Sequence, residues 1–352
     1  MGDTLGLQRA RTRALGWSAA VLSATVAVCV IAVAAGPTVV PPGVAADVIG
    51  RHLAGVAIPE ELATYSSVVW DIRLPRVLLG ATVGAGLAVA GVVLQALVAN
   101  VLADPYILGI NAGASTGAAA AILFGVGTGI FGALALQAMA FFGAAAASVL
   151  MLALARGGGG LSSARLLMGG VAVGYALTAV TSLLVFASDN AQGARSVMFW
   201  LLGSLSMAAF GPVLWATIAV VCACCLAFWV LGTRIDALTL GDDAARTLGV
   251  NPDRTRLIFV VVCCIMVGAV VSVAGSIGFV GLVVPHIARR LVGGLHRRVL
   301  PVAAALGAGL TVAADVASRT LLAPQEIPIG VLTALVGAPL LVVLVARSGE
   351  RQ

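Results

Sequence analysis

The residues best suited to chemistry are concentrated in one short segment of this sequence. Charged side chains make up 10% of the chain, yet eight of the 23 residues from Arg234 to Arg256 carry a charge. The eight are Arg234, Asp236, Asp242, Asp243, Arg246, Asp253, Arg254 and Arg256. Long apolar runs lie on both sides of the segment, so its carboxylates and guanidiniums are confined between two stretches suited to lipid.

Groups that many catalytic sites require are missing. All 20 basic residues are arginine, whereas a phosphate-binding P-loop requires a lysine. The chain therefore has no conventional nucleotide-hydrolysing site, and Schiff-base chemistry on lysine is excluded. The six cysteines lie inside apolar runs and match no zinc pattern, so we expect them to pack as small apolar side chains. We predict no catalytic residue, no metal site and no cofactor, and the protein is not expected to be an enzyme.

The elements around the charged segment have the composition of membrane helices. Hydrophobic residues make up 61% of the chain and the mean hydropathy is +1.12. About 20 apolar residues cross the hydrocarbon core of a bilayer as one helix. We predict an all-α, polytopic membrane helix bundle of about ten transmembrane helices, in which residues 1–352 form a single domain and 236–256 a polar segment within it. The expected spans are 15–35, 77–98, 105–124, 131–155, 163–187, 209–231, 257–275, 277–292, 299–318 and 329–346.

The arginines are divided unequally between the two faces that these spans define. With a cytoplasmic N-terminus, fifteen arginines fall on the cytoplasmic face and five on the other. The five are Arg51, Arg73, Arg76, Arg195 and Arg319. Because cytoplasmic loops are usually the positive ones, both termini and the polar segment are predicted to lie on the cytoplasmic side. The protein itself is predicted to be a multi-pass protein of the inner (cytoplasmic) cell membrane. The formal charge of +6 favours contact with anionic lipid and not with nucleic acid.

Glycines at a spacing of four predict close helix packing. They are Gly80 and Gly84, Gly109, Gly113 and Gly117, and Gly170 and Gly174. Small residues on one helix face let two backbones approach each other in a membrane, so we expect a dense bundle. The alternative is that some of these glycines let a span flex during transport.

The polar segment itself contains helix signals. Leu240, Ala244 and Leu248 repeat every four residues, as on one face of a short helix. Thr239 and Asp242 have the spacing of a capping box, and two acids suit the positive end of a helix dipole.

The residues that follow predict a turn and a restart. Gly249 stands where a left-handed cap is needed, and Asn251 with Pro252 resembles the start of another helix. We expect two short helices joined by a glycine turn. A well-capped connecting loop and a rigid knob presented to a protein partner both fit this pattern.

The few polar residues near the ends of the second and third spans have a predicted structural role. Gln95, Asn100, Asp104 and Asn111 are expected to form interhelical hydrogen bonds and not to contact a substrate directly, because polar groups at membrane depth usually face protein. His286 is likewise expected to be a structural hydrogen-bonding residue.

The polar segment resembles the coupling-helix region of the cobalamin, iron-siderophore and haem class of ABC importer permeases, whose usual form is L-G-(acidic)-x-A-x-x-L-G. The corresponding residues are Leu240, Gly241, Asp242, Asp243, Ala244, Arg246, Leu248 and Gly249. Residues 71–118, 197–206, 275–301 and 314–341 are similar to further stretches of that family in the same order. The resemblance covers nearly everything after residue 70.

The resemblance implies ten helices per subunit and several partners. A second permease subunit, identical or a paralogue, and two cytoplasmic ATPase subunits are expected, with the ATPases pushing on the 240–249 helix. An extracytoplasmic substrate-binding protein is expected to dock on Arg73, Arg76 and Arg319. Anchoring of these arginines to lipid headgroups is the alternative, and Asp315 could pair with Arg319 instead. Glu326 is expected to be a solvated turn residue.

The predicted function is that of the permease subunit of an ABC importer, carrying an iron-siderophore, haem or cobalamin-type chelate inward with energy from a separate ATPase. The competing hypothesis is a secondary transporter driven by an ion gradient. It would require an ionisable relay within the membrane, and the span interiors contain almost no charge.

Overall fold

The computed structural model describes residues 7–157 and 161–349, and within them the regular structure is helical, with no strand. Ten principal helices match the ten expected spans in order. They are α1 (Leu7–Ala34), α4 (Leu74–Leu97), α5 (Ile110–Phe124), α7 (Ala135–Arg156), α8 (Ser163–Phe186), α10 (Pro212–Val230), α13 (Pro252–Ala274), α14 (Val280–Val292), α15 (His296–Thr320) and α16 (Ile329–Gly349). The connecting elements are α2 (Pro42–Ala54), η1 (Glu60–Leu62), α3 (Ala63–Ser66), η2 (Ser67–Arg73), η3 (Pro105–Leu108), α6 (Thr128–Phe131), η4 (Gly132–Leu134), α9 (Ala191–Leu201), α11 (Gly232–Thr239) and α12 (Asp242–Thr247).

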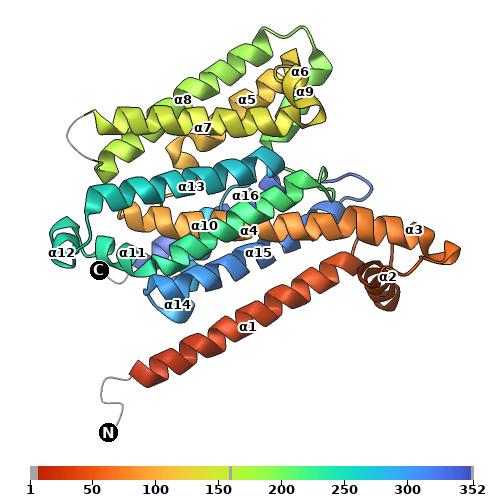
Figure 1. The fold of residues 1–352 in the computed structure, drawn as a ribbon, viewed down its shortest axis with the longest axis horizontal. Coiled ribbons are helices and arrows are strands. Elements are labelled where there is room, and N and C mark those ends of the chain that lie inside the picture. The colour runs from red at the N-terminus through yellow and green to blue at the C-terminus, as the bar shows by residue number, and fades with distance from the viewer. Residues whose placement is uncertain (1–6, 158–160, 350–352) are drawn as a thin grey trace.

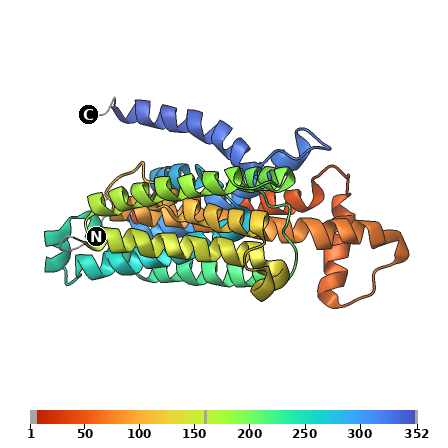
Figure 2. The ribbon, with the colours of Figure 1, turned by 90° about the horizontal axis from the view of Figure 1, so that it is seen from above.

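The long helices lie side by side and define two ends of the molecule. Figure 1 shows α11 and α12 at one end, which we call the α12 end, and α2 and α3 at the other, which we call the α2 end. Helix α1 begins and helix α16 finishes at the α12 end, as an even number of crossings requires. Figure 2 shows α16 diverging from the remaining bundle toward its C-terminal end.

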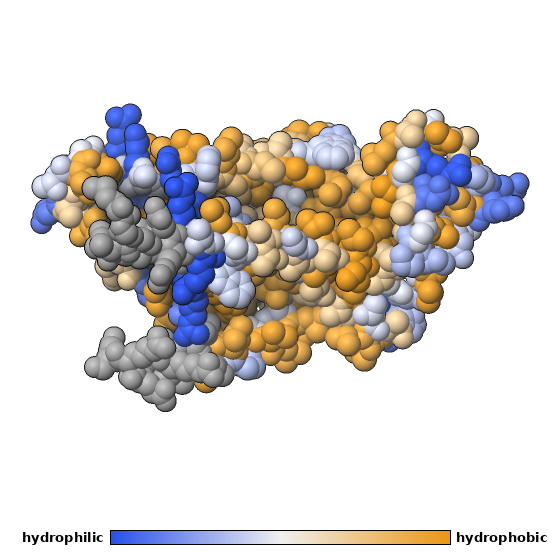
Figure 3. All heavy atoms as spheres, turned by 90° about the horizontal axis from the view of Figure 1, so that it is seen from below, coloured by the Kyte–Doolittle hydropathy of each residue, from blue (hydrophilic) through white to orange (hydrophobic). Residues whose placement is uncertain are grey.

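The surface of the bundle has the polarity of a membrane protein. Charged and polar residues gather at its two ends, and apolar residues predominate between them (Figure 3). In the described residues, seven helical stretches are long and apolar enough to cross a bilayer, and α5 and part of α16 are shorter apolar helices. The prediction of about ten spans is confirmed. Helix α14 is the shortest of the ten principal helices, with 13 residues, and is too short to cross the membrane as a helix on its own.

The residues before α14 explain why that crossing is incomplete. Between α13 and α14 the chain is not helical, and Gly275 and Phe279 have positive φ of 66° and 68°. The Tyr106 hydroxyl accepts the Ile277 N–H at 2.9 Å and lies 3.1 Å from the Ile277 carbonyl. Asn111 donates to the Ser276 hydroxyl at 3.1 Å. Non-helical backbone is tolerated inside a membrane where the protein itself supplies its partners.

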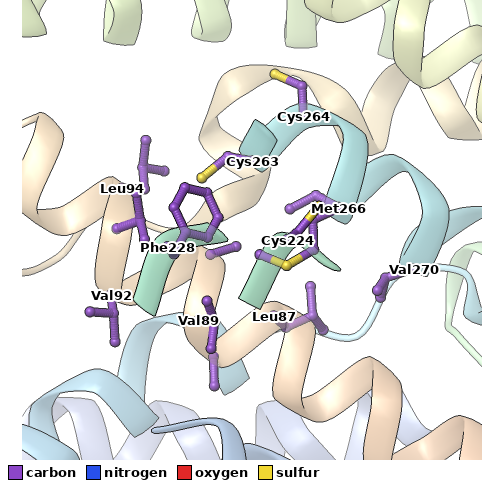
Figure 4. Packing of buried hydrophobic residues seen from close by; sticks show 14 of the residues in the cluster. Leu87, Val89, Val92, Leu94, Cys224, Phe228, Cys263, Cys264, Met266 and Val270 are labelled. Carbon is purple, nitrogen blue, oxygen red and sulfur yellow. The ribbon is translucent and has the colours of Figure 1, made fainter. Parts of the chain in front are cut away.

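Helix α4 lies at the centre of the core. Its Leu87 and Leu94 pack among residues of α10 and α13, including Phe228, Cys224 and Cys263 (Figure 4). These two cysteines are buried thiols among apolar neighbours, which confirms the expectation that cysteine serves packing here. In a membrane, van der Waals contact of this kind holds helices together.

Glycines bring pairs of helices into backbone contact. A Cβ added at Gly84 would lie 2.1 Å from the carbonyl oxygen of Gly307, so α4 and α15 touch at that point. A Cβ at Gly113 would lie 2.3 Å from the carbonyl oxygen of Gly143, where α5 meets α7. The prediction of close packing is confirmed at both positions. A Cβ at Gly174 would lie 3.8 Å from the Cα of Gly109, an ordinary van der Waals distance, so that position has room for a methyl group.

Candidate functional site

The polar segment forms a short helix between two glycine turns at the α12 end. Gly241 and Gly249 have φ of 98° and 77°, a region that favours glycine. Between them α12 contains six residues. Asp242 and Asp243 lie in its first turn and Arg246 in its last, where each charge suits the helix dipole. The predicted left-handed cap at Gly249 is confirmed.

Two other predictions for this segment are wrong. Thr239 forms no capping box with Asp242, because it is the last residue of α11 and its hydroxyl donates to the Asp236 carbonyl at 2.7 Å. Asn251 does accept the Arg254 N–H at 3.1 Å, but the helix that it caps is the long helix α13 and not a second short one. The polar segment is therefore joined directly to a spanning helix.

Two leucines of the predicted coupling motif point away from the bundle. Leu240 is 68% exposed and Leu248 is 61% exposed. Ala245, not Ala244, is the alanine of this segment that is fully buried against the bundle. Large apolar side chains displayed among charged ones are typical of a protein-binding surface. The segment therefore presents a capped helix with an apolar contact at each end.

An ion pair fastens α12 to α13. The guanidinium of Arg256 donates to both carboxylate oxygens of Asp242, at 2.6 and 2.9 Å. The Arg256 side chain is largely buried, and its hydrogen bonds are the main cause that lowers the pKa of Asp242 below its ordinary value. A second ion pair, Asp243 with Arg246 at 3.2 Å, is exposed on α12. A bidentate pair between two helices fixes their relative orientation.

The opposite, α2 end contains a buried cluster of charges. Arg76 donates to Asp315 at 2.6 Å and to the two carboxylate oxygens of Glu326 at 3.0 and 2.9 Å. Asp315 also faces Arg319 at 3.3 Å. The Arg76 and Asp315 side chains are almost completely buried, whereas Glu326 is 43% exposed. One arginine therefore joins α4, α15 and the turn between α15 and α16.

The three predicted docking arginines are not displayed on the surface. Arg73, Arg76 and Arg319 are 3%, 5% and 4% exposed. Arg73 donates to the carbonyls of Val33 and Ala34 at 3.0 and 2.6 Å, and Arg319 donates to a carbonyl at the end of α1 at 2.8 Å. Arg73 and Arg76 do not share a face, because one reaches α1 and the other α15. The alternative that Arg319 lies against Asp315 is confirmed, and Glu326 is an ion-pair partner and not merely a solvated residue.

The other polar residues divide into two groups. Gln95 donates to the Leu282 carbonyl on α14 at 3.2 Å, which confirms an interhelical hydrogen bond. Asn111 instead bonds Ser276 in the non-helical stretch before α14. The side chains of Asn100 and Asp104 instead accept the backbone N–H groups of Leu102 and Tyr106, each two residues later in the chain. These two residues therefore stabilise local turns and do not join helices. Nε2 of His286 has no hydrogen-bond partner among the described residues, so the expected structural hydrogen bond is not seen at that atom.

A cavity of about 550 Å³ lies at the α2 end beside Glu326. Its walls carry hydroxyl groups and aromatic rings, and they come from α5, α7, α9, α13 and the loops that follow α9 and α15. The lining residues are Ile122, Leu136, Gln137, Ser196, Phe199, Trp200, Ser204, Ser206, Met207, Ser272, Val273, Ala274, Glu326, Ile327 and Pro328. Sequence reasoning missed this cavity, because residues so far apart in the chain show no common spacing.

Two further hollows lie along α8 and α16 and share Leu201. The first, of about 670 Å³, lies against α16 and contains Phe279 and Leu335 in its walls. The second, of about 480 Å³, lies against α8 and contains Asn111 and Tyr175. Among the described residues that line either hollow, aspartate, glutamate and arginine are absent. Such walls offer a solute hydroxyl, amide and apolar groups.

Two short patterns in the chain resemble catalytic motifs but lack their geometry. Residues 113–117 read GxSxG, yet they lie inside α5 and Ser115 donates to the Asn111 carbonyl at 2.8 Å. Cys222 and Cys225 have CxxC spacing inside α10, where both remain free thiols. Within the part of the chain that the structure describes, three or more histidine, cysteine or acidic side chains are nowhere grouped so that they could hold a metal ion.

Comparison with known proteins places these features in context. The model of the FecCD transport family matches residues 24–347. The cobalamin import system permease protein BtuC of Halobacterium salinarum is 42% identical over 282 residues, which cover 80% of this chain and 73% of that protein. The hemin transport system permease protein HmuU of Yersinia pestis is 40% identical over 286 residues, 81% of this chain and 85% of that protein. A solved inward-facing structure, described as a metal-chelate type ABC transporter, is 30% identical and superposes with a TM-score of 0.81, covering 94% of this chain and 98% of that one.

Proposed function

The chain belongs to the FecCD transport family and is a membrane permease of the ABC importer type, and from this premise we propose that it carries an iron-siderophore, haem or cobalamin-type chelate inward with energy from a separate ATPase. Its relatives are named as permeases for cobalamin and hemin, and the proposal extends that substrate class to this chain. The absence of lysine supports a separate source of energy, because a P-loop in this chain would lack its essential cation.

The single observation that carries the proposal is the exposed helix α12 between its two glycine turns. Leu240 and Leu248 are exposed at the polar end of a membrane protein, and an ion pair to Arg256 holds the helix in place. A stiff projection with an apolar contact at each end suits the cleft of another protein better than it suits solvent. We place the ATPase there, with Asp242, Asp243 and Arg246 on the same projection, which puts the α12 end in the cytoplasm.

The transport pathway is assigned to the hollows beside α8 and α16. Their walls contain hydroxyl, amide and apolar groups without an acidic or basic side chain, so a large chelate would meet no strong binding site on its way. Helix α16 diverges from the bundle next to one hollow (Figure 2), and Leu335 and Val336 on it are exposed. A second permease subunit packed against this side would close the pathway.

Docking of a substrate-binding protein is proposed at the α2 end, with a changed role for the arginines. Arg73 and Arg319 donate to backbone carbonyls in the last turn of α1. They therefore fix the position of α1 at the α2 end and do not contact the binding protein themselves. Arg76 reaches toward the surface through Glu326, which is half-exposed. An acidic residue of a binding protein would contact Arg76 by displacing that glutamate.

The experiment is reconstitution with the cognate ATPase and binding protein. The purified permease alone should hydrolyse no ATP, should copurify with the ATPase when the two are co-expressed, and should move one of the three chelate classes into proteoliposomes only when ATP is supplied on the ATPase side. Uptake driven by a proton or sodium gradient without the ATPase would overturn the proposal. Labelling of Arg246 from the cell exterior would overturn the orientation.

A further inference from the structure

The start of α15 lacks the groups that normally complete a helix N-terminus. Its preceding residue, Leu295, supplies no side-chain cap, and its first turn contains no acidic residue. Arg297 and Arg298 lie in that turn instead, where positive charges oppose the helix dipole. The free N–H groups of a helix start need partners from elsewhere.

Helix α11 supplies the missing cap. The carboxylate of Asp236 accepts the backbone N–H of His296 at 3.1 Å and lies 2.6 Å from Nδ1 of the same residue. His296 is buried and Asp236 is 28% exposed, so this contact is partly shielded from solvent. A carboxylate at this position satisfies an unpaired N–H group and also compensates the two neighbouring arginines.

Helix α10 supplies a second missing bond at the same place. Pro301 lies inside α15 and has no N–H, so the carbonyl of Arg297, four residues earlier, loses its usual donor within the helix. Nε1 of Trp229, the residue before the last of α10, donates to that carbonyl at 3.2 Å. Arg297 returns a bond to the Val230 carbonyl at 3.3 Å.

These bonds come from the two helices that precede α12 in the chain, α10 and α11. Helix α11 is fixed in the core by Ile235 and Leu238, both buried, and it leads through the Leu240–Gly241 turn into α12. At Gly232 the approach is so close that an added Cβ would lie 2.9 Å from Cγ of Arg297. Helix α12 is therefore tied directly to α13 by Asp242 with Arg256, and the two helices that lead into it are tied to α15, α11 by Asp236 and α10 by Trp229.

We propose that Asp236 and Trp229 are positioning residues that pass the displacement of α12 to α15. This rests on the proposed function, in which an ATPase moves α12. Helix α15 has 25 residues, about 37 Å of continuous helix, and Asp315 near its other end binds Arg76. One helix thus connects the surface proposed for the ATPase with the charged cluster at the α2 end.

The test is uptake per ATP hydrolysed in proteoliposomes that contain the permease, its ATPase and its binding protein. D236A and W229F should each lower that ratio about fivefold or more, the lower range of measured coupling between sites, while the ATPase still copurifies. D236N keeps one acceptor oxygen and should have an intermediate effect. D47A, which removes a carboxylate from the exposed Asp47–Arg51 pair of α2, is the matched control and should leave the ratio unchanged.

A second variant separates a coupling role from a merely structural one. P301A restores the N–H that bonds the Arg297 carbonyl within α15, but it does not restore a bond to α10. If Trp229 acts by joining the two helices, W229F/P301A should remain as impaired as W229F. Recovery of the ratio in that double variant, or an unchanged ratio in D236A, would overturn the proposal. If the wild-type permease fails to copurify with the ATPase, the proposed function itself fails, and the coupling role fails with it.

Discussion

The carboxylate of Asp242 and the guanidinium of Arg256 form a bidentate ion pair, with N–O distances of 2.6 and 2.9 Å, that joins α12 to the first turns of α13. Asp242 stands at the start of α12, directly after a glycine with positive φ, and without the pair this short helix would be held by its flanking turns and by Ala245. The pair therefore decides whether α12 moves as part of α13 or independently of it.

Reversal of the charge at Asp242 tests this relationship. D242R places two guanidiniums against each other, so we expect ATP-driven uptake to fall by about tenfold or more, since like charges at close range cost on the order of 1 kcal/mol or more. R256D should have a similar effect. The double variant D242R/R256D should recover part of the uptake because it restores an ion pair. Wild-type uptake by D242R would contradict the coupling assignment.

The exposed leucines that flank α12 give a second prediction. L248D should reduce copurification of the ATPase by about tenfold or more, because central apolar contacts in an interface contribute about 2 kcal/mol or more. Its fold should be intact, since Leu248 is exposed in the isolated chain. L53D makes the same change at an exposed leucine of α2 and should leave copurification unchanged. Equal loss in both variants would indicate a general defect and not a contact with the ATPase.

The arginine cluster at the α2 end gives a prediction about stability. R76A leaves Asp315 buried without its main partner, which should destabilise the fold by about 3 kcal/mol or more. E326Q removes only a half-exposed partner and should cost about 1 kcal/mol or less. The measurement is thermal unfolding of the purified permease, with E61Q at an exposed glutamate as control. Equal effects of R76A and E326Q would contradict the distinction between buried and exposed partners.

The sequence pattern was sufficient to predict the helices, but it was not sufficient to predict which residues the arginines contact. Apolar run length and arginine asymmetry depend on the membrane alone, so ten helices and the common end of α1 and α16 followed from them. Arg73 and Arg76 lie three residues apart in one continuous helical stretch, and the sequence predicted the same docking role for both. Their actual partners are at the end of α1 and on α15, far away in the sequence, and nothing local to Arg76 indicates Asp315.

The same limit applies to the polar segment. The Gly249 cap and the Asn251 cap are local and were predicted correctly, whereas the capping box failed because Thr239 belongs to an additional helix, α11. The contact of Asp236 with His296 joins residues 60 positions apart, so only the fold reveals it. Pro301 is a sequence signal only for the neighbouring contact of Trp229, since the unpaired carbonyl of Arg297, four residues earlier, requires a donor from elsewhere.

Removal of the Glu326 carboxylate should alter docking of the binding protein. E326A frees the outer side of Arg76, so we expect the affinity for an acidic binding protein to rise by about threefold to fivefold, within about 1 kcal/mol, the range of partly exposed ion pairs. R76E should lower that affinity, and both effects should weaken as salt is added. Surface-based binding measurements at two salt concentrations would show this. Equal affinity in E326A, R76E and wild type would leave docking at Arg76 without support.

The contact of Gly84 with Gly307 predicts a defect that depends on one methyl group. In G84A the new Cβ would lie 2.1 Å from the Gly307 carbonyl oxygen, and both atoms belong to rigid helices, so α4 and α15 must separate. We expect a loss of stability of about 1–3 kcal/mol, the usual cost of overpacking. G174A is the matched control, because its Cβ would have 3.8 Å of clearance on α8 and alanine favours a helix. If G84A unfolds at the same temperature as G174A, the two helices are not in backbone contact at this crossing.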